Sequence, residues 1–150
     1  MRKMTIRPDE AMEGSGRDII TAPAVGSGVV LCLYDEITGM GGMCYILSPQ
    51  SGESRTVMQH LLDKLIAEGV RKENLWAKLV GGATIFSLKD CPGENDFGKS
   101  NVEYVRNWLH EVNIPVFAED TGNNFGRTVS LELEDGNVKI TLANRHVYDI

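Results

Sequence analysis

Residues 25–49 read VGSGVVLCLYDEITGMGGMCYILSP, and this stretch decides how the chain folds. Its residues 29–34 form an uninterrupted apolar run that ends at Asp35, which is typical of a strand buried on both faces. The six residues that follow contain a glycine and have the length of a hairpin connection. Residues 42–47 then form the returning strand, which a serine and a proline end. The stretch therefore predicts a buried hairpin.

Helical and strand patterns continue on both sides of this hairpin. Apolar residues at helical spacing predict one helix over residues 56–68 and a second from Ser100 to about Glu111, where Ser100 and Glu103 have the spacing of a capping box. Residues 89–99 are rich in turn-forming residues and predict a loop, and Pro23 is expected to interrupt strand pairing after Ile19 and Ile20. Further strands are predicted at residues 4–8, 75–80, 83–88, 114–118, 129–133 and 138–142.

Two helices between groups of strands favour an α+β fold, with mixed sheets covered by helices, over a doubly wound parallel sheet. No linker, repeat or low-complexity segment divides the chain, so we expect one domain spanning residues 1–150.

The composition excludes several classes of function. A net charge of −6 with scattered basic residues argues against a nucleic-acid partner. No apolar run approaches the roughly 18 residues of a membrane span, and the charged N-terminus is unlike a signal peptide, which predicts a cytoplasmic protein with no membrane insertion. The three cysteines and three histidines lack the spacing of a metal site. We therefore expect neither a metal nor a cofactor.

Five stretches in matching order resemble the CheD family of chemoreceptor glutamine deamidases, which act in chemotaxis. The family has a Gly-Ser-Cys turn before an apolar strand ending in aspartate, a Gly-Gly-Met stretch, a histidine and a closing proline. The matching stretches of this chain lie at residues 26–35, 41–49, 77–83, 98–101 and 118–127. The resemblance implies two packed mixed β-sheets flanked by helices in α/β/β/α layers.

The resemblance also implies a cysteine and histidine dyad that this chain has lost. Such enzymes attack a glutamine amide with a thiolate, and a nearby imidazole lowers the thiol pKa and protonates the departing ammonia. Gly28 occupies the position of the family cysteine, and we assign Cys44 to the position of the histidine. A threonine that precedes the family cysteine matches Thr21 only if one extra residue is allowed.

Other residues of these stretches have two interpretations each. Cys44 is either a relocated nucleophile or a small buried side chain, and the Ser27 hydroxyl is expected to point away from the site because successive side chains of an extended backbone alternate. The remaining glycines either line a pocket and supply backbone amides or serve turns and bulges. These backbone candidates are Gly26, Gly41, Gly42, Gly81 and Gly82.

Three hypotheses about function follow. The first is a CheD-like protein that binds the cytoplasmic helices of methyl-accepting chemoreceptors, a CheC-type phosphatase, or both, without deamidase activity. The second is an active deamidase with a rearranged site that uses Cys44. The third is an interaction domain that works outside chemotaxis.

Overall fold

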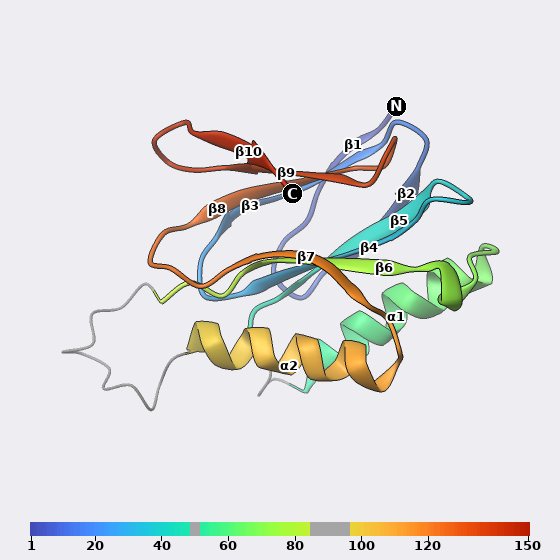
Figure 1. Cartoon of the computed structure of the whole chain (residues 1–150), viewed down its shortest axis with the longest axis horizontal. Coiled ribbons are helices and arrows are strands. Elements are labelled where there is room, and N and C mark those ends of the chain that lie inside the picture. Colours follow the sequence, from blue (N-terminus) through green and yellow to red (C-terminus); the bar gives the residue numbers. More distant parts are fainter. Residues whose placement is uncertain (49–51, 85–96) are drawn as a thin grey trace.

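The structure is a computed structural model, and it describes residues 1–48, 52–84 and 97–150. These residues form two five-stranded sheets and two α-helices (Figure 1). The inner sheet has the order β2 (Ala11–Ser15), β5 (Met40–Ile46), β4 (Val29–Asp35), β6 (Trp76–Gly81) and β7 (Val116–Thr121). The outer sheet has the order β1 (Lys3–Thr5), β3 (Ile19–Val25), β8 (Arg127–Glu132), β9 (Asn137–Thr141) and β10 (Val147–Asp149).

Both sheets are mixed. Strand β7 runs parallel to β6, and β1 runs parallel to β3, whereas the other paired strands are antiparallel. The α+β class and the two mixed sheets expected from the sequence are therefore confirmed.

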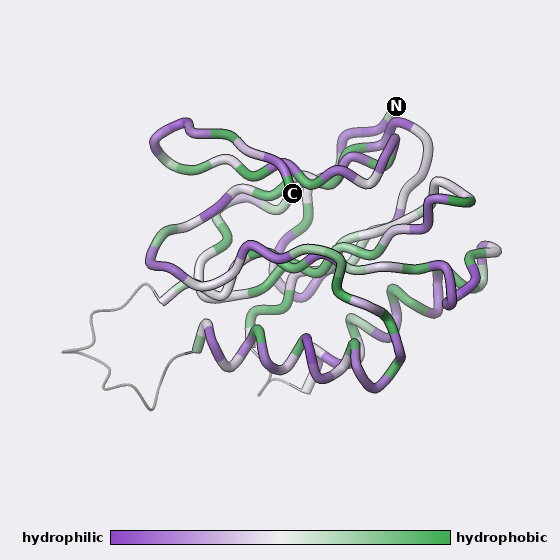
Figure 2. The backbone as a smooth tube through the Cα atoms, viewed as in Figure 1, coloured by the Kyte–Doolittle hydropathy of each residue, from purple (hydrophilic) through white to green (hydrophobic). Residues whose placement is uncertain are grey.

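Strand β4 is the central strand of the inner sheet, between β5 and β6, and all seven of its residues are buried. Its side chains alternate between two cores. Val29, Leu31 and Leu33 pack with the helices, whereas Val30, Cys32 and Tyr34 pack between the two sheets. This double burial is the physical reason for the continuous apolar run, because neither face of the strand meets water. The predicted buried strand is confirmed. Figure 2 shows hydrophobic residues in the inner sheet, between the outer sheet and the helices.

The helices α1 (Glu53–Ala67) and α2 (Phe97–Glu111) both cover the inner sheet (Figure 1). The described residues therefore form three layers, helices, inner sheet and outer sheet, rather than the α/β/β/α order expected with helices on both outer faces. The burial pattern of β8 gives the reason, since buried residues alternate there with half-exposed ones such as Ser130 and Glu132. A polar outward face needs no covering helix.

Several boundaries differ from the sequence expectations. Helix α1 begins three residues before the predicted start, and α2 begins at Phe97, so the last residues of the predicted loop are helical. Strands β2 and β10 were missed, because both are short edge strands with few fully buried side chains. Residues 85–96, with most of the predicted strand at 83–88 and loop at 89–99, lie outside the described residues.

Among the described residues, no helix has the length and apolar character that crossing a membrane requires.

Candidate functional site

The Gly-Ser-Gly turn, residues 26–28, connects β3 of the outer sheet to β4 of the inner sheet. Each of its three backbone carbonyls accepts a hydrogen bond. Ala83 N donates to Gly26 O at 3.0 Å, Asn101 Nδ2 to Ser27 O at 2.9 Å, and Gly82 N to Gly28 O at 2.8 Å. A connection with all of its carbonyls bound has little freedom to move. The turn is therefore held by Gly82 and Ala83, directly after β6, and by Asn101 of α2.

Asn101 is the side chain that ties α2 to this turn. It is 1% exposed, and its Nδ2 also donates to Leu47 O at 3.0 Å, at the end of β5. Its Oδ1 is buried and has no hydrogen-bond partner among the residues that the structure describes. In the sequence, Asn101 is the last residue of the matching stretch 98–101, and this position is the signal that could have identified it.

The glycines Gly81 and Gly82 are required by this close approach of β6 to the turn. Both have a positive φ, 120° and 66°. A Cβ at Gly81 would stand 2.4 Å from Gly28 O, where no side chain fits. The structure thus brings Gly26, Ser27, Gly81 and Gly82 together around Gly28.

Gly41 and Gly42 lie at the other end of the β-hairpin, far from this turn. They pair with Tyr34 and Leu33 on β4, so about six residues of extended strand, or about 20 Å, separate them from Gly28. A Cβ at Gly41 would be 2.4 Å from Leu33 O. These two glycines allow close packing within the fold and do not border the turn.

Tyr45 is the side chain that faces Gly28. A Cβ built on Gly28 would stand 2.6 Å from Tyr45 Cε1 and 2.9 Å from Ile46 O. The Tyr45 side chain is 5% exposed and packs in the core between the sheets. Burial raises the pKa of its phenol, while a hydrogen bond from the Gly26 backbone partly offsets this rise in pKa. Tyr45 therefore closes the space beside position 28.

Cys44 faces the opposite side of the inner sheet. It pairs with Leu31 of β4, and both side chains pack in the core that the helices cover. Cys44 has no exposed surface, and burial raises the pKa of its thiol. Because strand residues alternate in direction, the residue next to it in the sequence, Tyr45, turns toward Gly28 instead. The structure does not bring Cys44 to the Gly-Ser-Gly turn.

Thr21 also points away from the turn. Its hydroxyl shares a 2.8 Å hydrogen bond with Ser130 on the outward face of the outer sheet, whereas its neighbour Ala22 faces the core that contains Tyr45. A register shift between Ala22 and Val25 inserts one extra residue into β3, so the strand continues through its proline as a bulge. An alignment that allows no extra residue would place Ala22, rather than Thr21, at the position of the family threonine.

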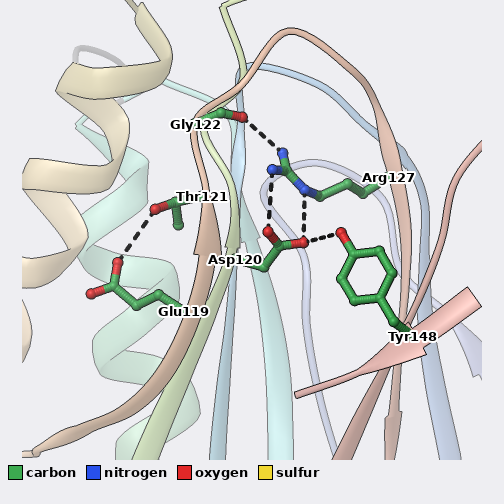
Figure 3. A network of polar contacts seen from close by, with 6 residues as sticks. All are labelled: Glu119, Asp120, Thr121, Gly122, Arg127 and Tyr148. Carbon is green, nitrogen blue, oxygen red and sulfur yellow. Dashed lines mark hydrogen bonds and ion pairs between the residues drawn. The ribbon is translucent and has the colours of Figure 1, made fainter.

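A buried ion pair lies beside the turn, on β7 and β8 (Figure 3). Arg127 Nε donates to Asp120 Oδ2 at 3.1 Å, its Nη1 donates to Gly122 O at 3.1 Å, and the Tyr148 hydroxyl also donates to Asp120. Glu119 does not join this pair, since it binds Arg106 of α2. Arg127 with Asp120 and Arg106 with Glu119 are therefore two separate ion pairs.

The chain's three histidines are exposed and do not belong to this turn. His60 lies on α1, His110 on α2, and His146 between β9 and β10. Within residues 1–48, 52–84 and 97–150, no three His, Cys, Asp or Glu residues gather in a way that could hold a metal ion. An imidazole is therefore not placed beside Gly28 by any of them.

The structure thus combines two mixed sheets, helices on one face of the inner sheet, and a glycine-lined turn held by α2 and by the residues that follow β6. The chain belongs to the CheD family. The model of that family, described as CheD chemotactic sensory transduction, matches residues 54–142, more than half of the chain. The matched region begins after the Gly-Ser-Gly turn and β5.

Curated relatives extend the match over most of the chain. A probable chemoreceptor glutamine deamidase CheD of Clostridium tetani is 36% identical over 133 residues, 82% of this chain and 81% of the relative. A protein of the same description in Methanococcus vannielii is 39% identical over 80% of this chain and 82% of the relative. Another, in Moorella thermoacetica, is 34% identical over 93% of this chain and 95% of the relative. The relatives' names support a chemotaxis role of the CheD kind for this chain.

Proposed function

We propose that this protein binds chemoreceptors as a CheD family member but does not convert their glutamines to glutamate. One observation carries the proposal. Gly28, at the position where the family presents its cysteine, has no side chain and lies against Tyr45. Hydrolysis of an amide needs a nucleophile and a proton donor, and this position supplies neither.

Tyr45 is a poor replacement for the family histidine. Burial raises the pKa of its phenol above the usual value near 10, so it stays protonated at neutral pH and cannot act as a base. Because the side chain of Tyr45 faces Gly28 and that of Cys44 does not, we propose that Tyr45, rather than Cys44, occupies the place of the family histidine. The direction of its side chain supports this assignment.

The geometry disfavours the alternative of an active site that uses Cys44. A nucleophilic cysteine needs access to substrate and a lowered thiol pKa. Cys44 has no exposed surface, its thiol pKa is raised, and it faces the helices rather than the turn. We infer that Cys44 is a core residue.

The intact backbone of the turn supports a retained binding role. Its three carbonyls are bound and Asn101 is buried against it, so the scaffold persists where the chemistry is lost. The named relatives are probable chemoreceptor glutamine deamidases. We propose that this chain binds the same class of receptor, at the cytoplasmic helices of the receptor. A CheC-type phosphatase, expected from the resemblance, is proposed as a second partner, and the cytoplasm as the location.

Mass spectrometry of a receptor cytoplasmic fragment tests the loss of activity. We expect no conversion of glutamine to glutamate after incubation with this protein, whereas the Clostridium tetani relative serves as the positive control. Measurable conversion would overturn the proposal, and Ser27→Ala and Cys44→Ala variants would then identify the nucleophile.

Binding is measured separately by titration calorimetry with the same receptor fragment and with a purified CheC-type phosphatase. We expect saturable binding to the receptor. Binding to neither partner would contradict a receptor role and would favour an interaction domain that works outside chemotaxis.

A further inference from the structure

Arg127 is a fully buried arginine that uses all three of its nitrogens. Its Nε and Nη2 contact the two carboxylate oxygens of Asp120 at 3.1 and 3.5 Å, and its Nη1 donates to Gly122 O. The guanidinium carbon also lies 4.7 Å from the centre of the Phe125 ring. The side chain therefore joins an acid on β7 to the backbone of the β7–β8 connection (Figure 3).

This connection continues by backbone hydrogen bonds to the Gly-Ser-Gly turn. Gly122 N donates to Gly81 O at 2.9 Å, and Thr84 N donates to Asn123 O at 2.8 Å. The same short segment, residues 81–84, carries the two amides that hold Gly26 O and Gly28 O. The route from Arg127 to the turn is thus a continuous series of hydrogen bonds.

At its other end the route reaches β10. This strand has three residues, lies at the edge of the outer sheet and, of the described strands, pairs with β9 alone. Tyr148, its middle residue, donates its hydroxyl to the Asp120 carboxylate that binds Arg127. A short edge strand is among the elements that open most readily in a folded protein.

We propose that Arg127 couples the docking of β10 to the conformation of the Gly-Ser-Gly turn, so that release of β10 loosens the turn. The coupling depends on the forked shape of the guanidinium, because its three separate nitrogens bind both Asp120 oxygens and Gly122 O at once, a geometry that the single ammonium of a lysine does not reproduce. It goes beyond the proposed binding function and does not depend on whether the turn performs chemistry.

Native-state amide exchange of the full-length protein, measured by NMR, tests this coupling. The reporters are the amides of Gly82, Ala83 and Gly122, each compared with the amide of Leu31 in the centre of β4. Arg127→Lys keeps the charge and loses the fork. We expect the three reporters to exchange about tenfold faster relative to Leu31 in this variant.

Two further variants make the result decisive. Tyr148→Phe removes only the hydroxyl from β10, and we expect the same reporters to exchange about threefold faster relative to Leu31. Arg106→Lys alters the ion pair with Glu119 on the same strand β7 and should leave the reporters unchanged. If Arg127→Lys fails to fold, Tyr148→Phe still decides.

If the exchange rates of the three reporter amides relative to Leu31 are unchanged in Arg127→Lys, the coupling is overturned. The loss of the fork would then have no effect on the opening of the turn. Faster reporters in Arg127→Lys together with unchanged reporters in Tyr148→Phe would also overturn it, because the route would end at Arg127 without reaching β10.

Discussion

Tyr45 Cε1 lies 2.6 Å from the point where a side chain on Gly28 would begin. Real Cβ atoms do not approach other atoms so closely, so a side chain at position 28 does not fit beside the present Tyr45 ring unless one of them moves. The glycine and the tyrosine therefore depend on each other. A side chain at position 28 therefore requires the Tyr45 ring to shift or to be replaced.

We predict that Gly28→Ala destabilises the protein in a way that Tyr45 controls. The backbone of Gly28 is outside the left-handed region, so alanine is allowed there and the cost comes from the clash with Tyr45 and Ile46 O. The expected loss in free energy of unfolding is about 1–3 kcal/mol. Urea denaturation measures it.

The matched double variant is Gly28→Ala with Tyr45→Leu, which removes the ring. We expect a favourable coupling of about 1 kcal/mol or more between the two changes. Additive effects would mean that Tyr45 is not what limits the space at position 28.

We predict that deamidase activity returns with Gly28→Cys and Tyr45→His but not with Gly28→Cys and Cys44→His. A histidine at position 45 would face the new thiol, whereas one at position 44 would be buried under the helices. General acid–base groups contribute about 10²–10⁴-fold to such reactions, so mass spectrometry of receptor glutamines should separate the pairs. Equal activity of both pairs would contradict the assignment of Tyr45.

We predict that Cys44 resists alkylation in the native protein. Its thiol has no exposed surface and a raised pKa, and Cys32 is equally buried with a thiol pKa raised by burial to about 12. Peptide mapping after treatment with iodoacetamide at neutral pH should find both unmodified until urea unfolds the chain. Fast native labelling of Cys44 alone would revive its role as a nucleophile.

We predict an acid dependence of stability centred on Asp18. Hydrogen bonds from the Ser15 backbone and from Arg2 lower the pKa of this carboxyl from 3.8 to about 2. A lowered folded-state pKa stabilises the protein above the unfolded value, and this contribution is lost as the pH falls from about 4 toward 2.

Asp18→Asn should therefore lower the free energy of unfolding by about 1–3 kcal/mol at pH 6, because the lost carboxylate held several hydrogen bonds. The difference from the unmodified protein should shrink below pH 4. Urea denaturation between pH 2.5 and 6 measures it, with exposed Asp63→Asn as the control. A difference independent of pH would show that Asp18 acts through packing alone.

The parts of the fold with strong periodicity were predictable. The apolar run of β4 could be recognised because both of its faces are buried, and the alternation of β8 and β9 predicted their hairpin. β2 and β10 could not be recognised, since their few buried residues leave little pattern. The spacing of apolar residues in a helix also predicts which face of the helix is buried, but it does not predict which face of which sheet that helix covers.

At the candidate site, the sequence by itself determined that position 28 carries no nucleophile, because that depends only on the identity of Gly28. It also determined the family, through stretches whose order survives divergence. Tertiary structure decided which side chain faces that position. A strand directs adjacent side chains to opposite faces. Tyr45 therefore lies at the turn in the core between the sheets, whereas its neighbour Cys44 lies in the core that the helices cover. Only the packed sheets show which face is which.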